Sequence, residues 1–112
     1  MKPSVLWIAA ALMLESADGR AETKAASGKT IYTKYGCYQC HGREGQGSSA
    51  TGPRIGPAPI PFSAFIGYLR QPTGQMPPYS RKVLSDSEAA DIYAFLESLP
   101  KPPARKSIPL LN

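Results

Sequence analysis

The feature that most constrains this chain is a short run of two cysteines and a histidine, Cys37, Cys40 and His41, in the order Cys-x-x-Cys-His. This is the pattern at which a c-type haem is attached to a protein. Two thiols separated by two residues on a helical turn can reach both vinyl groups at one haem edge as thioethers. The next residue then presents an imidazole nitrogen to the iron. The run predicts one covalent haem c, anchored by Cys37 and Cys40, with His41 as an axial ligand.

Two other chemistries use cysteines at this spacing. A redox-active Cys-x-x-Cys pair belongs to a βαβ context, but no segment of this chain shows the alternation of a strand. A structural zinc site needs four ligands, whereas the whole chain contains two Cys and one His. Haem attachment is therefore the interpretation that these residues favour.

The N-terminal segment has the pattern of a secretory signal peptide. Lys2 precedes an unbroken apolar run at residues 5–14, which is too short for a bilayer that takes ~20 residues to span. We expect cleavage after Ala21, export to the periplasm of a Gram-negative bacterium, and no membrane span afterwards. An N-terminal helix packed on the domain and an uncleaved anchor are the alternatives.

The second axial ligand of the iron follows by elimination. The chain has no second His, and its two Cys are used by the haem. Met1 and Met13 lie in the predicted signal peptide, which leaves Met76, directly before two prolines that stiffen its loop. The alternative role of such a Met is to fill the core. His/Met ligation raises the reduction potential and closes the iron to other ligands, which favours electron transfer over O₂ binding or catalysis.

Two segments outside the Cys-x-x-Cys-His turn have helical spacing in the first two thirds of the chain. One begins at Ser27, which suits a helix N-cap, and follows a small-residue entry segment at residues 21–27. The other spans residues 62–71 and ends before Pro72.

A third helix is predicted near the C-terminal end of the domain. Ser85 and Glu88 have the spacing of a capping box. The helix is expected to end at Pro100 and to present one apolar face, formed by Ala89, Ile92, Tyr93, Leu96 and Leu99.

Glycine and proline dominate the segments between the helices, with 10 Gly and 12 Pro in 112 residues. Residues 42–61 have almost no periodicity, and a loop of that length is acceptable only if it packs on something other than protein. The chain is therefore expected to be all-α, with three to four short helices and long loops around one haem. The predicted layout is a signal peptide at 1–21, one domain at 22–100 and a Pro-rich basic tail at 101–112.

The net charge of the chain indicates which kind of partner it can bind. A net charge of +5 favours acidic protein partners and salt-sensitive association. Nucleic acid is not expected, because no basic cluster is combined with a stacking motif. The alternative is scattered charge that only keeps the protein soluble.

Over residues 27–100 the chain resembles the small class I c-type cytochromes, which carry one His/Met-ligated haem. The residues that carry the resemblance are Gly28, the Cys-x-x-Cys-His-Gly run at 37–42, Thr51-Gly52-Pro53, Leu69-Arg70-x-Pro72, Met76-Pro77-Pro78-Tyr79 and the helix at 91–96. The resemblance implies the cytochrome c fold and a monomeric electron-transfer protein that is not an enzyme.

The resemblance also implies roles for single residues. The Pro53 carbonyl is expected to accept a hydrogen bond from the His41 imidazole. Gly28 is expected where the first helix crosses the last, near Tyr93 or Phe95. Tyr79 is expected to pack the Met76 loop. The haem propionates are expected to be contacted by Arg54, Tyr68 and Arg70. The alternative for each arginine is a solvated side chain.

Three functions are compatible with these residues. The first is a diffusible shuttle that exchanges electrons through the haem edge near Cys37 and Cys40. The second is a haem subunit of a dedicated dehydrogenase or oxidase, for which the tail would serve as a docking arm. The third is a haem enzyme or gas sensor, which requires a labile Met76.

Overall fold

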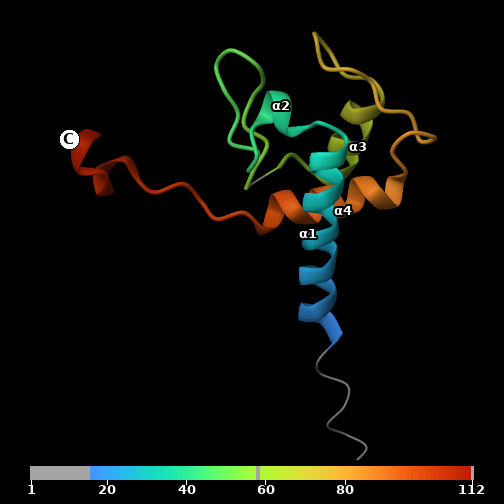
Figure 1. The fold of residues 1–112 in the computed structure, drawn as a ribbon, viewed down its shortest axis with the longest axis horizontal. Coiled ribbons are helices and arrows are strands. Elements are labelled where there is room, and N and C mark those ends of the chain that lie inside the picture. The colour runs from blue at the N-terminus through green and yellow to red at the C-terminus, as the bar shows by residue number, and fades with distance from the viewer. Residues whose placement is uncertain (1–15, 58, 112) are drawn as a thin grey trace, which may run out of the picture.

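The computed structural model describes residues 16–57 and 59–111 and consists of helices and loops (Figure 1). In these ranges the chain forms no strand, and only an isolated bridge joins Ser48 to Gly52. The all-α prediction is therefore confirmed. Most of the predicted signal peptide lies outside the described residues. The elements are α1 Ser16–Lys34, α2 Tyr38–His41, α3 Phe62–Arg70, α4 Asp86–Ser98 and two short 3-10 helices, η1 Arg105–Ser107 and η2 Pro109–Leu111.

The start of α1 differs from the sequence prediction. Within the described residues α1 spans Ser16–Lys34, so the expected helix start at Ser27, after a small-residue entry segment, is wrong. That segment is rich in Ala, Glu and Lys, which have high helix propensity. Ser27 is not an N-cap; its hydroxyl donates to the Asp91 carboxylate over 2.9 Å. Ala21, the expected cleavage position, lies within α1, and cleavage itself stays a prediction.

The crossing of α1 and α4 organises the fold (Figure 1). Gly28 is buried there, and a Cβ at this position would overlap the backbone carbonyl of Asp91. Only glycine lets the two backbones approach so closely. The close contact is with Asp91 and Ile92, so the expected position near Tyr93 or Phe95 is displaced towards the start of α4.

The core lies between α1, α3 and α4. Its buried members are Tyr32, Phe65, Leu69, Leu84, Ala89, Ile92, Phe95 and Leu96. The capping box of α4 is confirmed, because the Ser85 hydroxyl accepts from the Glu88 amide over 3.1 Å and the Glu88 carboxylate accepts from the Ser85 amide over 2.9 Å. The predicted apolar face of α4 is buried at Ala89, Ile92 and Leu96.

The segment at 101–111 extends away from the body of the molecule (Figure 1). It contains the two short 3-10 helices, which the sequence did not predict. Its apolar side chains are not buried, and Leu110 is 95% exposed. Among the described helices, none is long and apolar enough to cross a membrane.

Candidate functional site

The predicted haem anchors lie on one short turn. Gly36, with φ of +77°, ends α1 and leads into α2. The Cys37 amide donates to the Tyr32 carbonyl over 3.2 Å, and the His41 amide donates to the Cys37 carbonyl over 3.0 Å. Both cysteines are free thiols; Cys37 is half-buried and Cys40 is exposed. Burial raises the pKa of the Cys37 thiol to about 11, so this thiol is protonated at neutral pH.

A loop at residues 47–53 fixes the orientation of His41. Its Nδ1 lies 2.8 Å from the Pro53 carbonyl oxygen. This oxygen can only accept, so Nδ1 carries the proton and Nε2 keeps the lone pair that can bind a metal. The Gly47 amide donates to the His41 carbonyl over 2.8 Å, and the Thr51 hydroxyl donates to the Cys40 carbonyl over 2.7 Å. Three hydrogen bonds thus hold the turn.

Gly52 lies against the imidazole. A Cβ at this position would stand 3.3 Å from Cε1 and Nδ1 of His41 and 3.1 Å from the Cys40 carbonyl oxygen. The motif Thr51-Gly52-Pro53 could be recognised in the sequence, but this steric role could not, because it depends on how the loop folds back on α2.

Met76 lies in the loop between α3 and α4, within a segment that we call the strap (residues 74–78). Its side chain is half-buried and packs against the same core cluster as Cys37. Gly74, with φ of +69°, turns the chain into the strap, and Pro77 and Pro78 restrict its exit.

Tyr79 connects the strap to the Cys-x-x-Cys-His turn. Its hydroxyl donates to the Tyr35 carbonyl over 3.0 Å, and the two rings pack edge to face with centroids 6.4 Å apart. Burial raises the pKa of Tyr79, and the nearby thiols of Cys37 and Cys40 raise it further. Tyr79 thus joins the end of the strap to Tyr35, which precedes Cys37 by two residues.

Tyr68 and Arg70, which were expected at the haem propionates, both bind the ends of the strap. The Tyr68 hydroxyl is 2.8 Å from the Thr73 hydroxyl. Arg70 Nη1 donates over 2.8 Å to the carbonyls of Tyr79 and Leu84. Its Nε is buried without a hydrogen-bond partner among the described residues; the contact of Arg70 with a propionate stays a prediction.

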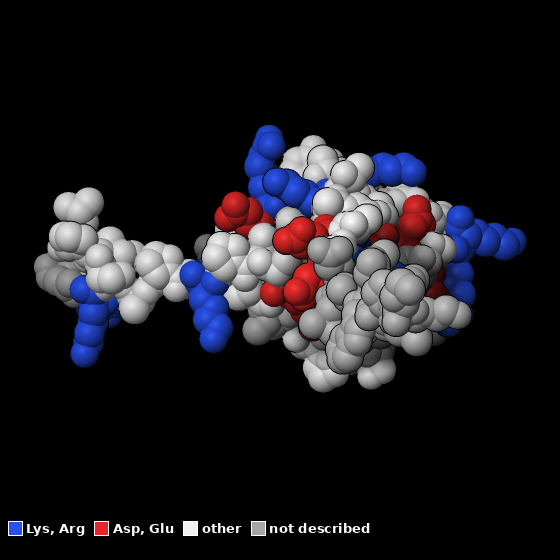
Figure 2. Space-filling model, turned by 90° about the horizontal axis from the view of Figure 1, so that it is seen from below, with Lys and Arg blue, Asp and Glu red and all other residues white. Residues whose placement is uncertain are grey.

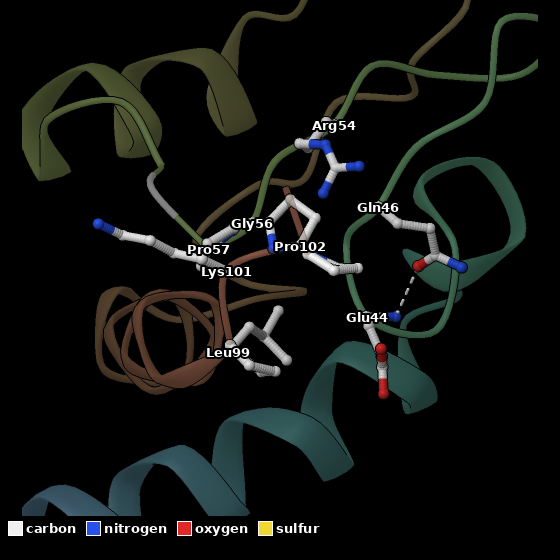
Figure 3. Close-up of a pocket in the computed structure, with 10 residues that line it drawn as sticks. Glu44, Gln46, Arg54, Gly56, Pro57, Leu99, Lys101 and Pro102 are labelled. Carbon is white, nitrogen blue, oxygen red and sulfur yellow. Dashed lines mark hydrogen bonds between the residues drawn. The ribbon is translucent and has the colours of Figure 1, made fainter. Parts of the chain in front are cut away.

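Arg54, for which the propionate contact stays a prediction, lines a cavity of about 240 Å³ between the loop after α2 and the chain that leaves α4 (Figure 3). None of Cys37, Cys40, His41 and Met76 lines this cavity, so it is not the predicted haem site. Its lining consists of Glu44, Gln46, Arg54, Gly56, Pro57, Leu99, Pro100, Lys101, Pro102 and Pro103.

The residues present fit a c-type haem. Two free thiols flank one turn, the adjacent imidazole is oriented with a free nitrogen, and Met76, the only thioether among the described residues, packs on the same core. The unpartnered Nε of Arg70 offers a donor to a carboxylate. Iron bound by His and Met in such a site is suited to electron transfer.

Comparison with known protein families places most of the chain in a family. Residues 23–96 match the model described as cytochrome C oxidase, cbb3-type, subunit III. This segment contains the Cys-x-x-Cys-His turn, α3, the strap and most of α4. Searches of curated proteins and of solved structures found no match. Domains of this family bind a c-type haem and serve in haem-based electron transfer with redox partners. Because the match covers about two thirds of the 112 residues, the chain belongs to the cbb3-type cytochrome c oxidase subunit III family of c-type cytochrome domains.

Proposed function

We propose that this protein carries single electrons between redox partner proteins on one haem, held by thioethers from Cys37 and Cys40 and by axial bonds from His41 and Met76. The bound haem supplies the Fe(II)/Fe(III) couple. The observation that carries the proposal is the hydrogen bond from His41 Nδ1 to Pro53, which leaves Nε2 available beside two free thiols. Family membership supports the cofactor and its role in electron transfer.

Met76 would close the sixth position of a haem iron bound by His41. The strap holds Met76 against the core, so the thioether competes with outside ligands for the iron. A closed site exchanges electrons without binding substrate, which is why we propose a carrier and not an enzyme. Carbon monoxide tests this directly: the reduced protein should fail to bind it at neutral pH. Ready binding would contradict a closed site and favour a gas sensor or haem enzyme.

The exposed position of Cys40 supports electron exchange at the attachment edge, where a partner can approach. Two cations are held beside α2: Lys34 lies 5.2 Å from the centroid of the Tyr35 ring, and Arg43 lies 5.9 Å from that of Tyr38. In the view from the side opposite α2, Asp and Glu gather near the middle of the face and Lys and Arg lie at its rim (Figure 2). That face is not the one where we expect docking; the net charge of +5 and the two cations beside α2 support our proposal of partners with acidic docking surfaces, and of reaction rates that fall as salt is added.

A second candidate is a fixed subunit of an oxidase or dehydrogenase complex. The family description, an oxidase subunit, favours it. So does the segment at 101–111, which extends from the body and carries Lys101 and Arg105. Purification from native membranes and periplasm separates the two: a shuttle elutes as a monomer, and a subunit elutes with its complex. Deletion of residues 101–112 should release it from the complex if this segment docks.

We propose that the protein is exported and matures by cleavage after Ala21, on the strength of Lys2 and the apolar run at 5–14. Intact mass of the protein from the periplasmic fraction tests this. The expected mass is that of residues 22–112 plus one haem. A mass that includes residues 1–21 would show that the segment is retained.

A further inference from the structure

The strap is held at its ends. At the N-terminal end of the strap, the Tyr68 hydroxyl lies 2.8 Å from the Thr73 hydroxyl. At the C-terminal end, which we call the far end, the Tyr79 amide donates to the Leu69 carbonyl over 2.8 Å. Among the described residues, residues 74–78 form no hydrogen bond of their own. The position of Met76 therefore depends on what holds the two ends.

Arg70 makes the most hydrogen bonds at the ends of the strap. Its side chain is only 13% exposed and lies at the C-terminal end of α3. One guanidinium group joins three points beyond the strap, because Nη1 donates to the carbonyls of Tyr79 and Leu84 over 2.8 Å each and Nη2 bonds the Asp86 carboxylate at 2.5 Å. A planar guanidinium can make all three bonds at once, which a lysine ammonium cannot do in the same geometry.

We propose that Arg70 is a positioning residue that fixes the far end of the strap and so keeps the Met76 sulfur on the iron. The proposal rests on the function proposed above, since it takes Met76 as the axial ligand. Without the guanidinium, three bonds between α3 and the segment that follows the strap are lost. Met76 then leaves its place more often, and the sixth position opens to outside ligands.

Imidazole measures this opening. It binds only to molecules in which Met76 has left the iron, so its observed affinity scales with the open fraction. The Arg70→Met variant keeps the length of the side chain and removes every donor. We expect its ferric holoprotein to bind imidazole about tenfold more tightly than the wild type. Arg70→Lys keeps the charge but not the planar guanidinium. Its imidazole affinity should lie between those of the wild type and Arg70→Met.

The matched control is Ala26→Gly, on the exposed middle of α1. It weakens a helix without touching the strap, so it lowers global stability alone. We expect its imidazole affinity to equal that of the wild type. If Arg70→Met does not incorporate haem, Asp86→Asn replaces it, because this variant weakens only one of the three bonds. It should still bind imidazole more tightly than Ala26→Gly.

Each outcome has a definite meaning. Equal imidazole affinity in Arg70→Met and Ala26→Gly would overturn the proposal. A changed midpoint potential with unchanged imidazole affinity would also overturn it, and would assign Arg70 to a propionate instead. A wild-type ferric spectrum without the sulfur-to-iron band would remove Met76 as a ligand and overturn this proposal together with the His/Met part of the proposed function.

Discussion

The His41 imidazole donates from Nδ1 to the Pro53 carbonyl oxygen across 2.8 Å. This single bond settles which ring nitrogen carries the proton and leaves Nε2 for the iron. It also increases the electron density that the imidazole gives to a metal. The bond depends on the loop at 47–53, which is also joined to this turn by hydrogen bonds from Gly47 and Thr51 to the His41 and Cys40 carbonyls.

Gly52→Ala tests this arrangement. The new Cβ would lie 3.3 Å from the imidazole and 3.1 Å from the Cys40 carbonyl, so the loop must shift by a few tenths of an ångström. We expect a weaker hydrogen bond to His41 and, because the imidazole then donates less, a higher midpoint potential. Redox titration measures it, with Gly67→Ala as the control, since a Cβ there meets nothing. Equal potentials would show that the loop does not tune the iron.

Gly28→Ala should damage the fold. Its Cβ would overlap the Asp91 carbonyl, so α1 and α4 would have to separate. Overpacking of this kind costs roughly 1–3 kcal/mol or more. Denaturant unfolding of the holoprotein measures the loss. Gly67→Ala, on the exposed side of α3, is the control: a Cβ there meets nothing, so it should leave stability unchanged or slightly raised.

Ser85→Ala removes one half of the capping box of α4. The hydroxyl no longer accepts from the Glu88 amide, which leaves an unsatisfied donor at the helix start. We expect the free energy of unfolding to fall by about 1 kcal/mol. Ser85→Thr can still cap and should retain most of the stability, and an equal loss in both variants would contradict the capping role.

Acid should weaken the protein through Asp86. Hydrogen bonds from Arg70, and then from Arg81, hold the pKa of this carboxyl below its ordinary value of 3.8. A pKa that is lower in the folded state means stability that is present above 3.8 and is lost as the pH falls further. Urea unfolding as a function of pH should therefore show a decline below about pH 4.

Asp86→Asn should make that decline shallower without abolishing it. Glu88 contributes in the same direction, because its hydrogen bond from the Ser85 amide also lowers its pKa. A variant that declines as steeply as the wild type would show that Asp86 is not responsible.

The sequence predicted those parts of the fold that rest on local patterns. The capping box and apolar face of α4 follow from residue spacing alone, and the Cys37-to-His41 turn follows from the chemistry of haem attachment. The start of α1 was missed, because residues before Ser27 have helix propensity but no apolar face to reveal it.

The parts that depend on long-range contacts were harder to predict. The propionate contact of Arg70 stays a prediction, but the sequence did not indicate that its guanidinium bonds residues 9 to 16 positions further along the chain. No local sequence pattern indicates such long-range hydrogen bonds. The same holds for Gly52, whose closeness to His41 exists only once the loop has folded back.

The central claim is tested most directly by the ferric absorption spectrum of the purified holoprotein beside that of Met76→Ala. The wild type should show the weak band near the red end of the spectrum that reports sulfur bound to iron, and the variant should lose it and become high-spin. The midpoint potential of Met76→Ala should lie below that of the wild type by on the order of 0.1 V, because axial ligands set much of the haem potential. A wild-type spectrum that is already high-spin, or a variant spectrum identical to the wild type, would contradict His41/Met76 ligation.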